Sequence, residues 1–448
     1  MNISFYTLGC KLNYAETSQL REQFEKLGHS VVEYGEPTDA VLINTCTVTE
    51  NADTECRKII RRSLRTSPNA FVGVTGCYAQ LQPEEIASID GVDAVFGAQE
   101  KFNIPKLITD FKKLETPQIF VNEFNDDLEF VGAKSSDNDS RTRAVFKIQD
   151  GCNYNCSFCT IPLARGGSRS MDFFKIEESF KELEKSGYSE IVLSGINLGD
   201  YTGKNGEKFT DVVKHIDSFT TNSRVRISSI EPNLLKAEIL QTVAQSDVFC
   251  PHFHIPLQSG SPEVLKMMRR RYKASYYEEL ILKIKSEMPH CCIGVDVIVG
   301  FPGETDEYFE ETYNFLKELP ISYLHVFTYS ERENTPAVVF KDKIPPQLKK
   351  ARTTRLRALS AFKKLEFYAS QMGSERTVIP ESYNAETGRW IGFTENYVRV
   401  EFPAPAVIIQ KPMRVVLKEM LGEHVLAELT ESELLKEENF PEYISILV

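Results

Sequence analysis

The sequence predicts an α/β protein with an N-terminal parallel-sheet domain, a partial (βα)6 barrel and a small C-terminal antiparallel β-barrel. Two runs of alternating strand-like and helix-like segments predict the first two regions, and a change to short β-rich runs predicts the third. A chain of 448 residues also exceeds the length of one ordinary domain. We therefore expect a first domain at 1–114, a linker at 115–143, a barrel domain at 144–372 and a terminal domain at 373–448.

The first domain opens with strand-like ISFYTL and a helix predicted from Ala15 to Leu27, in which apolar residues recur at helical spacing before Gly28 as the C-cap. The alternation continues with three strand-like segments, AVLIN, FVGVT and DAVFG. Between them lie a basic helix around KIIRRSLR and a helix opened by Pro83. Such alternation is typical of a parallel sheet covered by helices.

Three of these predicted strands run into a cysteine, in the segments YTLGC, LINTC and GVTGC. Cys10, Cys46 and Cys77 therefore follow the carboxyl ends of parallel strands. These ends share one edge of a sheet, where α/β folds build their sites. We expect the three cysteines, which are distant in sequence, to meet at that edge.

The polar run GAKSSDNDSR marks the linker. Six strand-like segments separated by helices then predict a partial barrel rather than a closed eightfold one: RAVFKIQ, EIVLSG, RVRISSIE, HFHIPLQ, IGVDVIVG and YLHVFTYS. A long basic helix near 346–371 precedes three β-rich runs that predict the small barrel: ERTVIPESY, RWIGFTENYVRVEF and MRVVLKEMLGEHVLAEL.

The composition indicates a soluble, globular protein, with 42% hydrophobic and 26% charged residues, and the two features that follow place it in the cytoplasm. No run of about 18 apolar residues predicts a membrane span. The N-terminal MNISFYTLGC lacks the features of a signal peptide. Ten cysteines in such a chain favour metal ligation or catalysis over disulfides. We expect Cys56, Cys250, Cys291 and Cys292, which lack ligand-like settings, to be buried structural thiols.

The most specific motif is DGCNYNCSFCTIPLARGGSRS at 150–170, where Cys152, Cys156 and Cys159 form Cys-x3-Cys-x2-Cys after the first barrel strand. A structural zinc site takes four ligands. Three thiolates can instead hold three irons of a [4Fe–4S] cluster and leave the fourth iron open for a substrate or cofactor. The alternative is a zinc knuckle completed by a remote histidine.

This loop resembles the signature of the radical S-adenosylmethionine (radical SAM) enzymes, in which the open iron binds the methionine amino and carboxylate groups. With Cys10, Cys46, Cys77 and the terminal barrel, the whole chain resembles the methylthiotransferases; ARGGSRS, SGINLGDY, SSIEP, HIPLQSGS and VGFPGET match as well. The resemblance implies that the three N-terminal cysteines bind a second, auxiliary [4Fe–4S] cluster. It also implies that the terminal barrel is a TRAM-like RNA-binding domain.

The segment TLGCKLNYAETSQL resembles the branch that acts on N6-threonylcarbamoyladenosine at position 37 of the tRNA anticodon loop. Lys11 is the distinguishing residue, because the isopentenyladenosine enzymes usually show GCQMN there and the ribosomal-protein enzymes show GCPKN. The implied reaction adds a methylthio group at C2 of the adenine. Three alternatives remain: the isopentenyladenosine-37 enzyme, a ribosomal-protein methylthiotransferase, and a non-catalytic metal-bearing RNA-binding protein.

An adenine C2–H bond is strong and unactivated, so acid–base catalysis cannot replace the hydrogen by sulfur, and a radical cofactor is required. As the resemblance implies, the cluster on Cys152, Cys156 and Cys159 cleaves S-adenosylmethionine to a 5′-deoxyadenosyl radical that activates C2. A second S-adenosylmethionine methylates a sulfur on the auxiliary cluster. An electron donor such as flavodoxin or ferredoxin and a sulfur source are implied partners, and we expect a monomer.

Candidates for binding S-adenosylmethionine follow the ends of the barrel strands. We expect Phe158 to pack against the adenine, and the Ser194–Gly195 pair to meet the methionine amino group. For both His252 and His254 the alternative is a hydrogen-bonded core residue. Arg165, near the cluster loop, is a candidate for stabilising a carboxylate or the reduced cluster, and a structural ion pair is its alternative. The full set is Phe158, Ser194, Gly195, Glu231, His254, Gln258 and Asp296.

The formal net charge of −12 opposes RNA binding overall, but phosphate contacts need only local positive charge. Three basic clusters supply it: RKIIRRSLR, KMMRRRYK and LKKARTTRLRALSAFKK. Trp390 and Phe393 are candidates for stacking on an unpaired base. The alternative for each cluster is a solvated helix face. The predicted RNA-binding residues are Lys349, Lys350, Arg352, Arg355, Arg357, Arg389 and Trp390.

Overall fold

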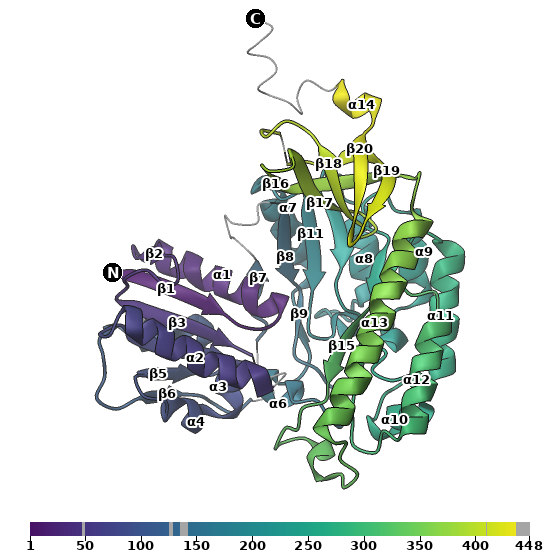
Figure 1. Ribbon diagram of the computed structural model, residues 1–448. Helices are drawn as coiled ribbons and strands as arrows, with labels where there is room; N and C mark the ends of the chain where they lie inside the picture. Colours follow the sequence, from purple (N-terminus) through teal and green to yellow (C-terminus); the bar gives the residue numbers. More distant parts are fainter. Residues whose placement is uncertain (47–49, 125–128, 135–141, 409, 436–448) are drawn as a thin grey trace, which may run out of the picture.

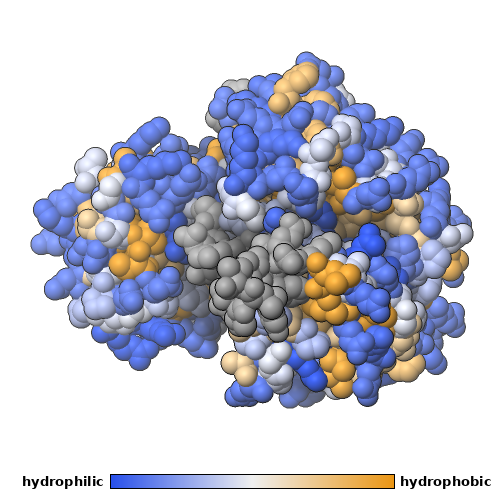
Figure 2. All heavy atoms as spheres, turned by 90° about the horizontal axis from the view of Figure 1, so that it is seen from above, coloured by the Kyte–Doolittle hydropathy of each residue, from blue (hydrophilic) through white to orange (hydrophobic). Residues whose placement is uncertain are grey.

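The computed structural model describes residues 1–46, 50–124, 129–134, 142–408 and 410–435 (Figure 1). An N-terminal α/β region lies beside a central barrel, and a small terminal barrel sits at one end of the central one (Figure 1). Viewed from the terminal barrel, most of the visible surface is hydrophilic and apolar side chains form small patches (Figure 2). Within the described ranges, no helix is both long and apolar enough to span a membrane.

The N-terminal region is a six-stranded parallel sheet in the order β2-β1-β3-β4-β5-β6. Its central strands are buried on both faces, as expected when helices cover both sides of a parallel sheet. Its strands are β1 (Asn2–Thr7), β2 (Ser30–Val32), β3 (Ala40–Thr45), β4 (Phe71–Gly76), β5 (Ala94–Phe96) and β6 (Gln118–Phe120). Its helices are α1 (Lys11–Lys26), α2 (Glu50–Thr66), α3 (Cys77–Leu81), α4 (Pro83–Ala87) and α5 (Ile104–Leu107).

Helix α1 begins four residues before the predicted start, because Cys10 has extended backbone and serves as its N-cap. The expected linker at 115–143 also differs from the structure. Strand β6 within it pairs with β5 and completes the N-terminal sheet, while β7 (Ala133–Lys134) pairs antiparallel with β8 of the central barrel. Short strands of three and two residues carry too little periodicity to be recognised in sequence.

The central region contains the six predicted strands as an open parallel barrel. Strands β8, β11 and β12 form one sheet and β13, β14 and β15 another, and single bridges such as Ser229 to His254 link the two. The strands are β8 (Arg143–Lys147), β11 (Glu190–Ser194), β12 (Arg224–Ile227), β13 (His252–His254), β14 (Cys292–Val299) and β15 (Tyr323–Thr328). A short pair, β9 (Gln149–Asp150) and β10 (Arg169–Ser170), flanks the cysteine loop.

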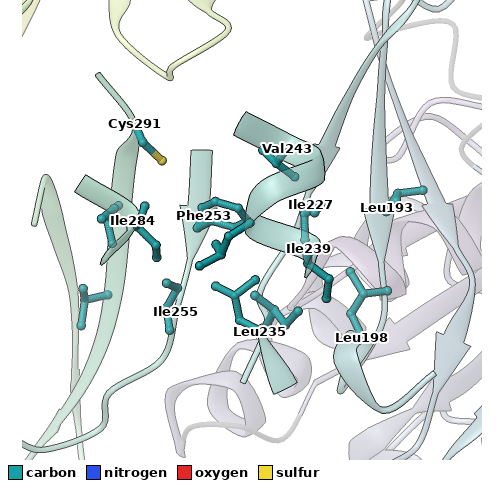
Figure 3. Packing of buried hydrophobic residues seen from close by; sticks show 14 of the residues in the cluster. Leu193, Leu198, Ile227, Leu235, Ile239, Val243, Phe253, Ile255, Ile284 and Cys291 are labelled. Atoms are coloured by element: carbon teal, nitrogen blue, oxygen red, sulfur yellow. The ribbon is translucent and has the colours of Figure 1, made fainter. Parts of the chain in front are cut away.

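The barrel strands alternate between two environments, as the two-residue period of a strand requires. Residues such as Leu193, Ile227 and Phe253 face the helices and form the largest apolar core (Figure 3). Their neighbours in sequence face the barrel interior and include many charged groups. The covering helices are α6 (Ile161–Arg165), α7 (Ile176–Lys185), α8 (Phe209–Asp217), α9 (Ala237–Gln245), α10 (Pro262–Met267), α11 (Ala274–Glu287), α12 (Asp306–Glu318) and α13 (Pro346–Ser370).

The terminal region is a closed five-stranded barrel in the order β16-β17-β18-β20-β19, which leaves no free sheet edge. Helix α13 leads into it, and Phe367 and Tyr368 of that helix pack in its core. Its elements are β16 (Glu375–Asn384), β17 (Arg389–Thr394), β18 (Arg399–Pro403), β19 (Met413–Leu421), β20 (His424–Leu429) and α14 (Glu431–Leu434). The cysteines expected to be structural are all buried: Cys56, Cys250, Cys291 and Cys292.

Candidate functional site

Cys152, Cys156 and Cys159 occupy the loop between β9 and α6. The Cys152 amide donates to the Gly166 carbonyl at 3.1 Å, and the Cys159 amide donates to the Cys156 carbonyl at 3.1 Å, so the loop folds back on itself. Within the described residues, no three ligand-type side chains converge on one single-ion position. A [4Fe–4S] cluster needs a wider arrangement, because each thiolate binds a different iron.

Two side chains that were not predicted to lie near the cluster contact these thiols. The Arg270 guanidinium lies 3.1 Å from Cys156 Sγ and also pairs with the Glu231 carboxylate. The Asn197 amide nitrogen lies 3.8 Å from Cys152 Sγ. Arg270 belongs to the KMMRRRYK cluster that was assigned to phosphate contacts, and its buried position corrects that assignment. The sequence around Arg270 is a run of basic residues, and such a run predicts a position at the surface.

The environment of the loop favours a thiolate-binding cation. Burial raises the pKa of the Cys152 thiol and raises that of Cys159 to about 12. Bound iron would stabilise the thiolate form against this burial, because the thiolate is the metal ligand. Thiolates are the ligands that iron–sulfur clusters take, and three of them leave one iron of a [4Fe–4S] cluster without a protein ligand. The buried Asn197 Oδ1 has no hydrogen-bond partner among the described residues. The donor set thus fits a cluster with one open iron.

A pocket of about 250 Å³ opens beside the cysteine loop. Four residues predicted from the sequence line it: Phe158, Cys159, Gln258 and Asp296. The far wall is contributed by β15 and the segment after it, which the sequence reasoning missed: Phe327, Thr328, Tyr329, Ser330 and Arg332. A concave, mainly apolar site with a few polar groups is typical of a cofactor pocket.

The remaining predicted cofactor residues do not line this pocket. Glu231 is held behind the cysteine loop by Arg270. The Ser194 hydroxyl bonds within its own strand, to the Val192 carbonyl at 3.3 Å, and a side chain at Gly195 would meet Gln149 Oε1 at 2.8 Å. Gly195 therefore allows Gln149 to approach and hold the cysteine loop.

The two histidines of β13 have different settings. His254 Nε2 lies 2.8 Å from Asp296 Oδ1, so His254 adjoins the pocket through that carboxylate. His252 lies deeper, 3.1 Å from the Tyr323 hydroxyl, and burial together with the nearby Arg226 holds its pKa well below the usual value. His252 is therefore a neutral residue of the barrel wall.

Cys10, Cys46 and Cys77 follow the ends of β1, β3 and β4, which are neighbours in the sheet. A side chain at Gly9 would lie 2.8 Å from Cys46 Sγ, so glycine keeps the space between the first two cysteines open. Burial raises the pKa of Cys77, and Cys10 is close enough to raise it further. The sheet thus gathers the three thiols at one edge.

Arg165 lies beside this second group of thiols. Its guanidinium donates to Asn13 Oδ1 at 2.6 Å, and its Nε, although buried, has no hydrogen-bond partner among the described residues. Cys77 and Cys10 are close enough to raise the pKa of Arg165, after Glu16. A buried N–H without an acceptor next to two thiols fits a negatively charged cluster there.

A buried ion network joins the two cysteine groups. Glu16 of α1 accepts from Lys101 at 2.6 Å, from Lys147 at 2.7 Å and from Arg165 at 2.9 Å. Asp150, two residues before Cys152, accepts from Lys147 at 2.7 Å and from Arg165 at 3.0 Å. Arg165 is therefore in a structural ion pair, and that pair ties the N-terminal sheet to the cysteine loop.

The predicted RNA-binding residues of α13 divide into two groups. Lys350, Arg355 and Arg357 are exposed, although Arg355 pairs with Glu310. Lys349 is half-buried, with its ammonium 3.2 Å from the Tyr329 carbonyl. Arg352 is buried and bonds Glu304 at 2.8 Å and Asp306 at 2.6 Å. Its prediction as an RNA-binding residue is therefore wrong, and Arg352 holds α13 against the segment that leads into α12.

The prediction that Trp390 and Phe393 stack on an unpaired base also needs correction. Trp390 is buried in the barrel core, and its Nε1 donates to the Pro405 carbonyl at 2.8 Å, so neither ring face is free for a base. Phe393 is half-buried and faces the central region, where the Arg143 guanidinium lies 5.0 Å from its ring centre. Arg389 remains partly exposed and lies 3.7 Å from Glu401.

Known proteins resemble this chain over most of its length. Residues 2–97 match the model of "Uncharacterized protein family UPF0004" and residues 146–316 match that of the radical SAM superfamily. Threonylcarbamoyladenosine tRNA methylthiotransferase MtaB of Bacillus subtilis is 40% identical over 92% of this chain and 93% of its own. The chain belongs to the radical SAM methylthiotransferase family. The present chain is also 37% identical to MtaB of Aquifex aeolicus, over 90% of its own length and 96% of the Aquifex protein.

The tRNA-2-methylthio-N(6)-dimethylallyladenosine synthase of Clostridium botulinum (strain Loch Maree) is 34% identical over 78% of this methylthiotransferase and 79% of its own chain. Among solved structures, TsrM of Kitasatospora setae, a radical S-adenosylmethionine methyltransferase, has a TM-score of 0.56 at 16% identity, covering 75% of this chain and 77% of that one. At such low identity the likeness concerns the fold alone.

Proposed function

We propose that this methylthiotransferase adds a methylthio group to C2 of N6-threonylcarbamoyladenosine at position 37 of tRNA. The observation that carries the proposal is the match to MtaB, at 40% identity over 92% of the chain. The match to the dimethylallyladenosine synthase is lower in identity and covers 78%. The side-chain geometry supports the same proposal, because two cysteine groups in different regions are joined by one buried ion network.

S-adenosylmethionine and a [4Fe–4S] cluster are the cofactors that the radical SAM family implies. We assign that cluster to Cys152, Cys156 and Cys159, and a second [4Fe–4S] cluster to Cys10, Cys46 and Cys77. When bound, these groups supply the one-electron and sulfur chemistry that replaces the C2 hydrogen. The donor sets of both cysteine groups support the assignment.

The chain's own residues bind and orient these groups. Phe158, Gln258 and Asp296 would form the walls that hold S-adenosylmethionine in the pocket beside Cys159. Glu231 orients Arg270, which donates to Cys156 Sγ. Arg165 fixes the N-terminal sheet against the loop, and its Nε, which has no partner among the described residues, would donate to the second cluster.

Each of the three regions has its own role in the proposed function. Residues 1–114, with strand β6, carry the second cluster; residues 144–372 carry the radical chemistry; residues 373–435 together with α13 contact the tRNA anticodon loop. Exposed basic groups on α13 and the terminal barrel support the RNA contact: Lys350, Arg357, Lys411, Arg414 and Lys418. An electron donor such as flavodoxin or ferredoxin and a sulfur source complete the reaction of a cytoplasmic monomer.

The test uses anaerobically reconstituted enzyme with S-adenosylmethionine, a reductant and tRNA that carries N6-threonylcarbamoyladenosine. Mass spectrometry of the digested tRNA is expected to show the 2-methylthio nucleoside, with isopentenyladenosine tRNA as the parallel substrate. If only the isopentenyladenosine tRNA gives product, the proposed radical methylthiolation stands, but the proposed acceptor nucleoside is wrong. Release of 5′-deoxyadenosine without either product would overturn both tRNA acceptors.

A further inference from the structure

The cysteine loop is covered by the segment that connects α10 to α11. The Ser157 amide donates to the Met268 carbonyl at 3.1 Å, and the Ser157 hydroxyl donates to the Met267 carbonyl at 2.8 Å. In the same segment, the Arg270 guanidinium lies 3.1 Å from Cys156 Sγ. The segment therefore packs directly on the part of the loop that carries Cys156.

Arg271 of this segment covers the loop from the solvent side. Its guanidinium lies over the ring of Tyr154, 3.7 Å from the ring centre, and donates to the Asn153 carbonyl at 3.1 Å. Arg271 and Asn153 are exposed, and Tyr154 is buried. The Tyr154 amide in turn donates to Cys152 Sγ at 3.4 Å. One buried residue, Tyr154, therefore lies between the surface at Arg271 and Cys152.

The segment is strongly basic. Residues 266–273, KMMRRRYK, include five basic residues and no acidic one. Arg270 is paired with Glu231, whereas the other four are exposed. We call these four the basic rim: Lys266, Arg269, Arg271 and Lys273. Among the described residues, the carboxylate within ion-pair distance of the basic rim is that of Glu263, 3.8 Å from Lys266. A positively charged surface thus borders the cysteine loop.

The basic rim and the pocket adjoin different halves of the cysteine loop. Residues 158–161 line the pocket and lead into α6, whose Arg165 pairs with Glu16 of the N-terminal region. Residues 153–157 lie against the segment that carries the basic rim. Helix α10, which leads into this segment, lies at the end of the central barrel away from the terminal barrel (Figure 1). A base in the pocket and a partner on the basic rim therefore contact the loop at separate places.

The proposed chemistry needs a redox partner at this loop. Each cleavage of S-adenosylmethionine consumes one electron: the C5′–S bond breaks, the sulfonium becomes the thioether of methionine, and the deoxyadenosyl fragment keeps the unpaired electron. The electron comes from a one-electron carrier, which has to come close because electron transfer slows steeply with distance. Redox proteins form small, transient interfaces of less than about 1,200 Å². Their association depends on complementary charge, which steers the two proteins together.

We propose that the basic rim is the docking surface for an acidic one-electron carrier protein. This inference rests on the proposed function, in which Cys152, Cys156 and Cys159 hold the cluster that receives the electron. The positive rim attracts an acidic partner and places it over Tyr154 and Arg270, which contact two of these thiols. RNA is the other polyanion that a basic surface attracts. It is disfavoured here because the terminal barrel lies at the opposite end of the central barrel (Figure 1).

The first measurement is binding without electron transfer. The probe is an acidic flavodoxin in its oxidised form, titrated into the reconstituted enzyme and followed by flavin fluorescence. The test variant is the double substitution Arg269→Glu and Lys273→Glu, because Arg271 is needed to cover Tyr154. Reversing two charges replaces attraction by repulsion, so flavodoxin binding at low salt should weaken by roughly 10-fold. The difference should shrink as the salt concentration rises.

The second measurement separates docking from damage to the cluster. Formation of 5′-deoxyadenosine at limiting reduced flavodoxin should fall by the same factor of about 10 in the double variant. Reduced methyl viologen is a small cation that needs no docking surface, and with it the rate should not fall. Iron content, the absorption spectrum and tRNA affinity are expected to match wild type.

The matched control reverses two charges elsewhere on the central barrel. Lys214 and Lys317 are exposed and lie in the last turns of α8 and α12. The helices of a βα barrel run back along the strands, so these turns lie at the end away from the cysteine loop. The double substitution Lys214→Glu and Lys317→Glu changes the net charge equally and should bind flavodoxin as wild type does.

Unchanged flavodoxin binding in the Arg269→Glu and Lys273→Glu variant would overturn the inference. An equal loss of rate with methyl viologen would also overturn it, because the segment would then act on the cluster itself. Weaker tRNA binding with normal flavodoxin binding would assign the basic rim to RNA instead. If flavodoxin docks as expected but neither tRNA gains a methylthio group, the inference stands and the proposed function is wrong.

Discussion

Replacing Glu16 by glutamine should loosen the contact between the N-terminal sheet and the central barrel. Glu16 is buried, and its carboxylate is the acceptor for Lys101 at 2.6 Å, Lys147 at 2.7 Å and Arg165 at 2.9 Å. Asp150 still neutralises Lys147 and Arg165 in the variant, but Lys101 then faces a neutral amide. Leaving a buried charge without its partner costs about 3–5 kcal/mol.

The assay is hydrogen exchange followed by mass spectrometry on the reconstituted enzyme, for peptides from α1 and β8. At 1.36 kcal/mol per tenfold, protection in these peptides should fall by roughly two to almost four orders of magnitude. Glu22→Gln, on the exposed side of the same helix, removes only a surface pair with Lys26 and should change the free energy by about 0.5 kcal/mol or less.

The pH dependence gives a second check on Glu16. Its neighbours hold its pKa well below the usual value. Its stabilisation is therefore fully present above the pKa of the unfolded chain, about 4.3, and is lost as the pH falls through the folded value. The difference between wild type and Glu16→Gln should be constant near neutral pH and narrow below about pH 4.3. A variant with wild-type protection, or a difference independent of acid, would refute the reasoning.

Three further outcomes are expected. Cys159→Ala should abolish 5′-deoxyadenosine formation and lower bound iron by about half, and unchanged iron would contradict the two-cluster assignment. Trp390→Phe loses one partly buried hydrogen bond and leaves a cavity in the barrel core, so it should destabilise the protein by at least about 1 kcal/mol in thermal unfolding, with tRNA affinity unchanged. Lys350→Ala and Arg357→Ala should each weaken tRNA binding and reduce the slope of log affinity against log salt by about 0.9 or less; an unchanged slope would remove α13 from the RNA surface.

Much of the architecture could be predicted because its signals are local. The six barrel strands were recognised from apolar runs between helices, and all six form the parallel barrel. The three N-terminal cysteines were located at strand ends, and the strands before them are neighbours in one sheet. Strands β6 and β7 were missed, because segments of three and two residues acquire their structure from the strands that they pair with.

The side chains of the candidate site were predictable in part. Phe158, Gln258 and Asp296 were expected from their position after strands, and they line one pocket. Arg352 and Arg270 were expected at the surface, since a basic run in sequence is indistinguishable from a solvated helix face. Their acidic partners, Glu304 and Glu231, lie 48 and 39 residues away and decide that both are buried.

The sequence by itself determined the order of the three regions, the two sets of cysteines and the family, because strand periodicity and cysteine spacing are properties of neighbouring residues. Only the tertiary structure decided which charges pair, since Arg165 meets Glu16 across 149 residues. The free energy of a charge depends on the groups and the solvent around it, and in a folded chain those groups come from remote segments.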